Sequence, residues 1–149
     1  MGYCGAMAPG DEVWAAFLAL DEAFAAGDVE GVLARFTTDE DLTLWRSALE
    51  EHAVGPAELR AFVVRMAGLP GSFTIDYESH RVTAVGDVAW LNAEGTGTWD
   101  DGAGTVKQMP HRVTAVFRRI DGSWKCHTRN GSQPRVVKLD PGRSGAGTS

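Results

Sequence analysis

Three short turn motifs, spaced along the second half of the chain, constrain its fold more than any other feature. Gly86-Asp87, Asp101-Gly102 and Asp121-Gly122 each stand between runs rich in β-branched and aromatic residues, which is the pattern of tight β-hairpins. The expected strands cover residues 73–85, 88–99, 106–120 and 123–132. Strands of this length, roughly twice the usual ~5–6 residues, must twist and bend. A bent sheet closed at one end by a helix leaves a cavity, and we therefore expect a pocket.

The first half of the chain carries helical patterns. One helix is predicted from Asp11, as its N-cap, to Ala26, with Gly27 as the left-handed residue that ends it. Asp28 is predicted to cap a second, shorter helix. A third helix is expected to begin at Gly55-Pro56 and to end at Gly68.

The order of these elements defines the fold class. A brief strand at residues 42–45 separates the second and third helices, and an antiparallel meander follows. Helices on one face of a curved antiparallel sheet make an α+β fold. We expect one domain over residues 11–134, flanked by flexible tails at residues 1–10 and 135–149, which are rich in Gly, Pro and Ser.

Composition excludes several classes of function. The net charge of −6 argues against nucleic-acid binding, which calls for a basic surface. No apolar run approaches the ~18 residues of a membrane span, and the N-terminus lacks the pattern of a signal peptide. A cytoplasmic location is the expectation. Cys126 is predicted to be a buried, inert thiol, and a disulfide with Cys4 is not expected.

No metal or cofactor is predicted. The sequence contains no phosphate-binding loop, no Cys-x-x-Cys motif and no nucleophile elbow. Its four histidines lack the spacing of metal ligands, and they are His52, His80, His111 and His127.

Hairpin alignment predicts which strand residues face the helices, because side chains alternate between the two sides of a sheet. When this alternation is followed from strand to strand through the three turns, Phe117, Trp124 and Trp90 are predicted to share the inner face. The polar members of this face are expected to be Tyr77, Asn92, Glu94, His111, Asn130 and Ser132. The outer, solvated face is expected to carry Arg112, Arg118, Lys125, His127 and Arg129.

Two further features of the strands bear on assembly and register. Apolar residues switch from odd to even positions along residues 73–85, which predicts a β-bulge near residues 79–81. The outer face is also expected to carry a modest apolar patch of Val82, Ala84, Ala89, Leu91 and Val116. A patch of this kind is typical of a dimer surface, so a homodimer through the outer sheet face is predicted.

These features resemble the SnoaL-like branch of the nuclear transport factor 2-like superfamily. The resemblance covers residues 11–134 and rests on Ala25-Ala26-Gly27-Asp28, on Gly55 before the third helix, and on residues 112–119 with the Asp121-Gly122-Ser123-Trp124-Lys125 turn. It implies a cone-shaped, cystatin-like α+β fold that is usually dimeric and has a pocket for a small hydrophobic organic molecule. Its members include isomerases, dehydratases, cyclases, epoxide hydrolases and non-catalytic association domains. Many relatives carry two histidines in the last strand, where this chain has Thr128 and Asn130, while Ser132 matches.

Two residues are candidates for proton transfer beside His111. Glu94 is expected next to His111 on the inner face, where a carboxylate can orient an imidazole as a general base. The same pair can equally be a buried ion pair that only orders the sheet. Asp21, on the apolar stripe of the first helix, is a possible acid or base in the cone or else a capping group at its rim.

Other inner-face residues are candidates for ligand binding. Asn92, Asn130 and Tyr77, with Ser132, can donate to a ligand carbonyl or can satisfy one another in the core. Trp14, Trp45, Trp90 and Trp124 can line a wall for a flat ligand or can be ordinary core residues.

The sequence thus supports two classes of function. The first is a cofactor-independent isomerase, cyclase or dehydratase that moves a proton on a small hydrophobic carbonyl compound. The second is a non-catalytic ligand-binding or dimeric association module. An epoxide hydrolase, which would use Asp21, an arginine and Glu94, is a third and less favoured interpretation.

Overall fold

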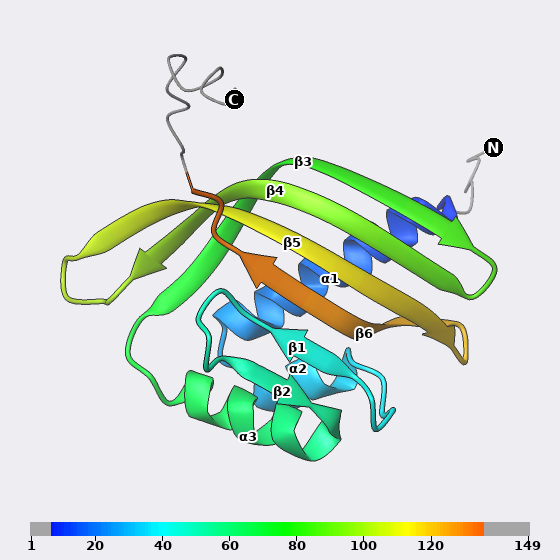
Figure 1. The fold of residues 1–149 in the computed structure, drawn as a ribbon, viewed down its shortest axis with the longest axis horizontal. Helices are drawn as coiled ribbons and strands as arrows, with labels where there is room; N and C mark the ends of the chain where they lie inside the picture. The colour runs from blue at the N-terminus through cyan, green and yellow to red at the C-terminus, as the bar shows by residue number, and fades with distance from the viewer. Residues whose placement is uncertain (1–6, 136–149) are drawn as a thin grey trace, which may run out of the picture.

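The computed structural model describes residues 7–135, in which helices pack against a strongly curved six-stranded sheet (Figure 1). The helices are α1 (Pro9–Ala25), α2 (Val29–Ala34) and α3 (Gly55–Ala67). The strands are β1 (Thr43–Trp45), β2 (His52–Val54), β3 (Ser72–Val85), β4 (Val88–Asp100), β5 (Val106–Ile120) and β6 (Ser123–Ser132). The predicted α+β class is confirmed. The predicted tails lie largely outside the described residues, as does Cys4.

The sheet differs from the predicted antiparallel meander in two respects. Its strand order is β2-β1-β6-β5-β4-β3, and β1 runs parallel to β6, so the sheet is mixed. The short hairpin of β1 and β2 had no separate sequence signal beyond residues 42–45. It extends the sheet past β6 and carries α3 to the same end of the molecule (Figure 1). The sheet curves but does not close.

Local sequence signals explain the helix ends. Pro9 in the first turn starts α1 two residues before the predicted Asp11, and Gly27 follows the helix at φ +66° as expected. The carboxylate of Asp28 accepts a 3.0 Å hydrogen bond from the Gly31 amide, which confirms it as the cap of α2. Gly55, at φ +82°, begins α3, and Gly68 ends it.

Two of the three predicted hairpin turns are confirmed. Val85 pairs with Val88 around Gly86-Asp87, and Ile120 pairs with Ser123 around Asp121-Gly122. The third connection is longer than predicted, because Asp100 pairs with Val106 and leaves a five-residue loop. The Asp101 carboxylate accepts bonds from two amides in that loop and holds its shape. Because this loop has an odd number of residues and the predicted turn had an even number, each residue of β4 pairs with a β5 residue of the opposite face to that predicted. The β4 side chains predicted to point inward therefore point outward, and the others point inward.

Two β-bulges set the remaining faces. One lies between Tyr77 and Ser79, next to the predicted position, and it turns Tyr77 toward α1. The other, which the sequence analysis did not predict, lies between Cys126 and Thr128 opposite Val116 and Phe117. Beyond it, Ala115 pairs with Arg129 and not with Thr128, so Arg129 points inward.

The core fills the space between α1 and the concave face of the sheet. Val13, Phe17 and Leu20 of α1 are fully buried. They face the buried strand residues Ala89, Leu91, Ala93, Val113, Ala115, Phe117 and Cys126. The burial predicted for Cys126 is confirmed. The predicted outer apolar patch is wrong for Ala89, Leu91, Val82 and Ala84. The five-residue loop places Ala89 and Leu91 on the core side, and Val82 and Ala84 lie on that side too because they pair with Leu91 and Ala89.

Among the helices of the described part of the chain, none combines the length and the apolar character that crossing a bilayer requires.

Candidate functional site

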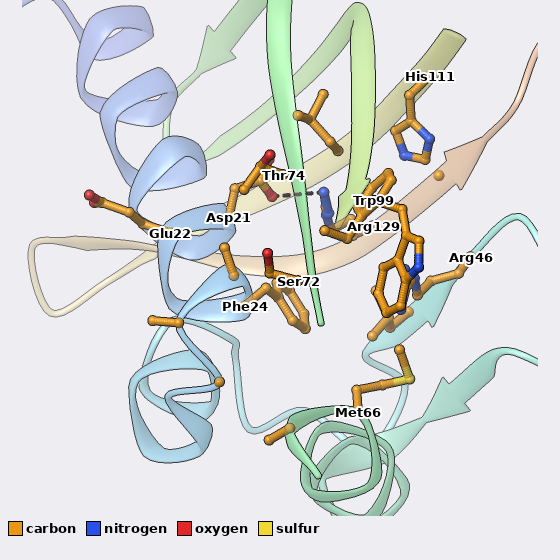
Figure 2. A pocket seen from close by; sticks show the side chains of 18 of the residues that line it. Asp21, Glu22, Phe24, Arg46, Met66, Ser72, Thr74, Trp99, His111 and Arg129 are labelled. Atoms are coloured by element: carbon orange, nitrogen blue, oxygen red, sulfur yellow. Dashed lines mark ion pairs between the residues drawn. The ribbon is translucent and has the colours of Figure 1, made fainter. Parts of the chain in front are cut away.

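A cavity of about 580 Å³ opens between the C-terminal half of α1, α3 and the curved end of the sheet (Figure 2). Its walls are mainly apolar and aromatic, and they include Leu18, Phe24, Leu44, Met66, Phe73, Ile75 and Trp99. Polar side chains reach it from α1, from β3, from β5, from β6 and from the end of β1: Asp21, Tyr77, His111, Arg129 and Arg46. Apolar walls with a few convergent polar groups are typical of a small-molecule site.

Asp21, Tyr77 and Arg129 form one connected cluster in the wall of this cavity. The Tyr77 hydroxyl donates a 2.5 Å hydrogen bond to Asp21 Oδ2. Arg129 Nη2 lies 2.7 Å from Asp21 Oδ1 as an ion pair without the alignment of a hydrogen bond, and a dashed line joins them in Figure 2. The predicted inward position of Asp21 and Tyr77 is therefore confirmed.

Burial governs the protonation of this cluster. Burial raises the pKa of Tyr77 well above its usual range, although the charge of Arg129 opposes the shift, so the phenol stays protonated and donates. Arg129 is 8% exposed, and its guanidinium lies 5.3 Å from the centre of the Phe17 ring and 5.6 Å from that of Phe24. Its Nε is buried without a hydrogen-bond partner. The guanidinium is thus a desolvated cation held mainly by Asp21.

His111 borders the cavity as a neutral imidazole. It is 7% exposed, and its Nδ1 has no hydrogen-bond partner. Burial, helped by the charges of Arg129 and Arg46, lowers the pKa of His111 to about 4. Its ring meets the Phe73 ring edge to face at 5.4 Å between centroids. Because Nδ1 is closed off, a ligand in the cavity can meet only the other ring nitrogen, Nε2, which donates when it carries the proton of the neutral ring.

Glycines make room for these rings. A Cβ at Gly131 would lie 3.1 Å from His111 Nε2, and a Cβ at Gly97 would lie 2.5 Å from the tip of Phe73. Both glycines face the helices, opposite the exposed side of the sheet. The ligand-sized space thus depends on missing side chains as much as on the curvature of the strands.

Several predicted site residues lie elsewhere. Glu94 pairs with Arg112 at 3.1 Å on the outer face, so the predicted contact between Glu94 and His111 is wrong. Asn92 accepts from Thr114 on that same face. Three more predicted inner residues are also exposed on the outer face, namely Trp90, Asn130 and Ser132. The five-residue loop displaces those of β4, and the second bulge displaces those of β6.

The predicted tryptophan wall is only partly formed. Trp45 lies at the cavity and is 53% exposed. Trp14 stacks on His80 at 3.7 Å between ring centroids, Trp124 Nε1 donates to Glu12 at 3.2 Å, and neither tryptophan lines the cavity. Trp99 lines it instead. The alternation of Ala89, Leu91 and Ala93 with polar residues was a signal for this face of β4, since Trp99 has the same parity.

Arg46 and Arg129 are two charged cavity residues that were not candidates from the sequence. The prediction that Arg129 lies on the solvated face is wrong, because the second bulge, in β6, turns its side chain inward. Arg46 follows β1 in a segment with no periodic pattern, so only the tertiary structure places it at the cavity.

One group of possible metal ligands lies outside the cavity. Asp39, Asp41 and His127 bring one donor atom each within 4.8 Å of one another at the surface. His127 Nε2 already lies 3.0 Å from Asp41 Oδ1, and Arg118 pairs with Asp39. Each of these three side chains therefore already has a partner within the protein.

Comparison with solved structures defines the class of protein. A candidate dehydratase of the NTF2-like family from Streptomyces avermitilis matches with a TM-score of 0.71 and 23% identity over 85% of this chain and 96% of that one. A ketosteroid isomerase-like protein from Erwinia carotovora atroseptica matches with a TM-score of 0.65 and 21% identity over 85% and 97%. A candidate scytalone dehydratase from Novosphingobium aromaticivorans matches with a TM-score of 0.71 and 12% identity over 87% of each chain. The fold is that of the NTF2-like proteins.

The family follows from the sequence itself. Residues 13–135 match the SnoaL-like domain, and the chain belongs to that family. No curated protein matches the chain. The resemblance stated from the turn and helix motifs is confirmed.

Proposed function

We propose that this protein binds a small, largely apolar carbonyl compound in the cavity and moves a proton on it without a cofactor. The observation that carries the proposal is the convergence of a neutral His111 and the Asp21 carboxylate on one apolar space of about 580 Å³. A carboxylate and a neutral donor beside the same ligand are the two groups that enolisation requires.

Each residue has a distinct role in this proposal. Asp21 accepts the proton as the C–H bond next to the carbonyl breaks, and the bonding electrons move onto the carbonyl oxygen. His111 donates a hydrogen bond to that oxygen and remains neutral, since its low pKa disfavours the imidazolium. Tyr77 and Arg129 are positioning residues that hold the carboxylate. Return of the proton to another carbon gives isomerisation. Attack of the enolate carbon on a second carbonyl of the same molecule, whose oxygen then takes the proton, gives cyclisation. Departure of a hydroxyl on the neighbouring carbon, which takes the abstracted proton and leaves as water, gives dehydration.

Two variants test the roles by experiment. Steroid, terpenoid and polyketide carbonyl compounds are screened by thermal shift, and proton exchange of each binder in D2O is followed by NMR. Asp21→Asn is expected to keep binding and to slow exchange by about 100-fold or more. Glu94→Gln, on the outer face, is the matched control and should exchange at the wild-type rate. Exchange that is unchanged in Asp21→Asn contradicts the proposal.

A non-catalytic binding module is the second candidate function. Both oxygens of Asp21 already have protein partners, so the cluster is satisfied without a substrate. In that case the screen yields binders, and none of them exchanges protons faster in the presence of protein than in buffer.

We also propose that the protein forms a homodimer through the outer sheet face. The residues that support this proposal are not those of the patch predicted from the sequence, apart from Val116. Val85, Val88 and Trp90 are 64%, 41% and 43% exposed there, and Trp90 pairs across the strands with Val116. Further along β4 and β5, the same face carries polar pairs such as Glu94 with Arg112. An apolar patch bordered by polar pairs suits contact with a second copy.

A further inference from the structure

The charges that face the cavity do not balance. Arg46 and Arg129 bring two positive charges, and Asp21 brings one negative charge. Glu22 also lies at the rim, but it is exposed and points away from the cavity in Figure 2. His111 adds no charge at neutral pH. One positive charge is therefore left without a partner inside the cavity.

Arg46 carries this excess charge. Outside the cavity, Glu51 forms an ion pair with it: Glu51 Oε2 lies 3.6 Å from Nε, beyond hydrogen-bonding distance, and Glu51 does not line the cavity. Within residues 7–135, its guanidinium donates no hydrogen bond. Its side chain is 30% exposed, and burial lowers its pKa, although the charge of Glu51 opposes the shift and that of Arg129 adds to it. A partly desolvated guanidinium with unused donors is stabilised by an anion that enters beside it.

Phe73 brings Arg46 and His111 to the same end of the cavity. The guanidinium carbon of Arg46 lies 5.9 Å from the centre of the Phe73 ring, and the His111 ring meets Phe73 at 5.4 Å. Trp99 lines the same cavity and is drawn between Arg46 and Arg129 in the view of Figure 2. One end of the cavity is thus surrounded by the charge of Arg46, the uncharged His111 ring, and the flat rings of Phe73 and Trp99.

We infer, as a refinement of the proposed function, that the ligand is an organic acid with a flat apolar body, whose carboxylate pairs with Arg46 and leaves the single N–H of the neutral His111 for the ligand's carbonyl oxygen. The single unbalanced charge matches a carboxylate better than a phosphate dianion. A planar carboxylate also fits the paired donors of a guanidinium. Phe73 and Trp99 provide faces for the apolar body.

The experiment compares acids with uncharged molecules of the same shape. Benzoate, cinnamate and 2-naphthoate are each titrated against their primary amides by calorimetry, on wild type, Arg46→Met, Arg46→Lys and Arg112→Gln. Arg112 lies on the outer face and is the control. Wild type and Arg112→Gln are expected to bind at least one acid about tenfold or more tightly than its amide. Arg46→Met should lose that preference while keeping the affinity for the amide, and Arg46→Lys should retain part of it.

The outcomes separate this inference from the function on which it rests. Amides or neutral carbonyl compounds that bind as tightly as the acids overturn the carboxylate assignment and leave the proposed function standing. A preference that survives in Arg46→Met overturns the role of Arg46. Failure of every acid, every amide and every carbonyl compound to bind overturns both proposals. Unfolding temperatures of the variants show whether any loss reflects the fold.

Discussion

The Arg129 guanidinium lies 2.7 Å from the Asp21 carboxylate, and this ion pair joins the last strand of the domain to its first helix. Both side chains are largely closed off from solvent, with 10% and 17% of their side-chain surface exposed. An ion pair in this position ties the helix to the sheet at the wall of the cavity. Removing either partner leaves the other charge buried.

The buried pair can be tested by a double-mutant cycle. Arg129→Met and Asp21→Asn are each expected to lower the free energy of unfolding by about 3 kcal/mol, and the double variant by clearly less than their sum. Urea unfolding measures all three. The exposed Arg112–Glu94 pair is the control, and its truncation should cost about 1 kcal/mol or less. Additive losses for Arg129 and Asp21 would show that they do not interact.

The low pKa of His111 makes stability depend on pH in a defined window. Because this pKa is lowered to about 4 in the folded protein, the unfolded chain, with the ordinary value of 6.5, binds the proton more readily. The free energy of unfolding is therefore not reduced by His111 above about pH 6.5. It falls, by on the order of 2 kcal/mol, as the pH is lowered toward 4, because the unfolded chain takes up the proton first.

Two measurements check this window. NMR titration of the ring protons reports the pKa of His111 directly, and a value near 6.5 would contradict the burial argument. Between pH 7 and pH 4, the free energy of unfolding of His111→Gln should decrease less steeply than that of the wild type. His52, in the exposed β2 strand, is the internal reference for an accessible histidine.

Gly97→Ala tests whether missing side chains shape the cavity. The new methyl group would lie 2.5 Å from the tip of the Phe73 ring, so the ring must move. Phe73 lines the cavity, and its displacement is expected to weaken binding of any ligand found in the screen by about tenfold. Calorimetry measures the affinity. Gly10→Ala is the control, since its Cβ would meet only ordinary contacts of 3.9 Å or more.

Trp90→Glu tests the proposed dimer. A charge at the centre of the outer apolar patch should shift the protein to the monomer, because burying an unpaired carboxylate in an interface is unfavourable. Light scattering after size exclusion gives the molar mass over a range of concentrations. Leu49→Ser, which changes a fully exposed residue in the loop between β1 and β2, is the control. A wild-type protein that is monomeric throughout removes the proposal.

Local signals were enough to predict much of the framework. Asp28 and Gly27 mark the boundary between α1 and α2, and the turns at Gly86-Asp87 and Asp121-Gly122 have the two residues expected of them. These features depend on φ angles and on hydrogen bonds between near neighbours in the chain. The sequence also pointed to the inward positions of Asp21, Tyr77 and His111 and to the family.

Only the tertiary structure decided which polar residues share the cavity. One extra residue in a turn or strand moves every following side chain to the other face, and that is how Glu94 and Asn130 came to lie outside while Arg129 lies inside. The composition of the loop after Asp100 permits either a two-residue or a five-residue turn. The choice between them depends on burying Leu91, Ala115 and Phe117 together under α1, which is a property of the packed sheet and not of any one segment.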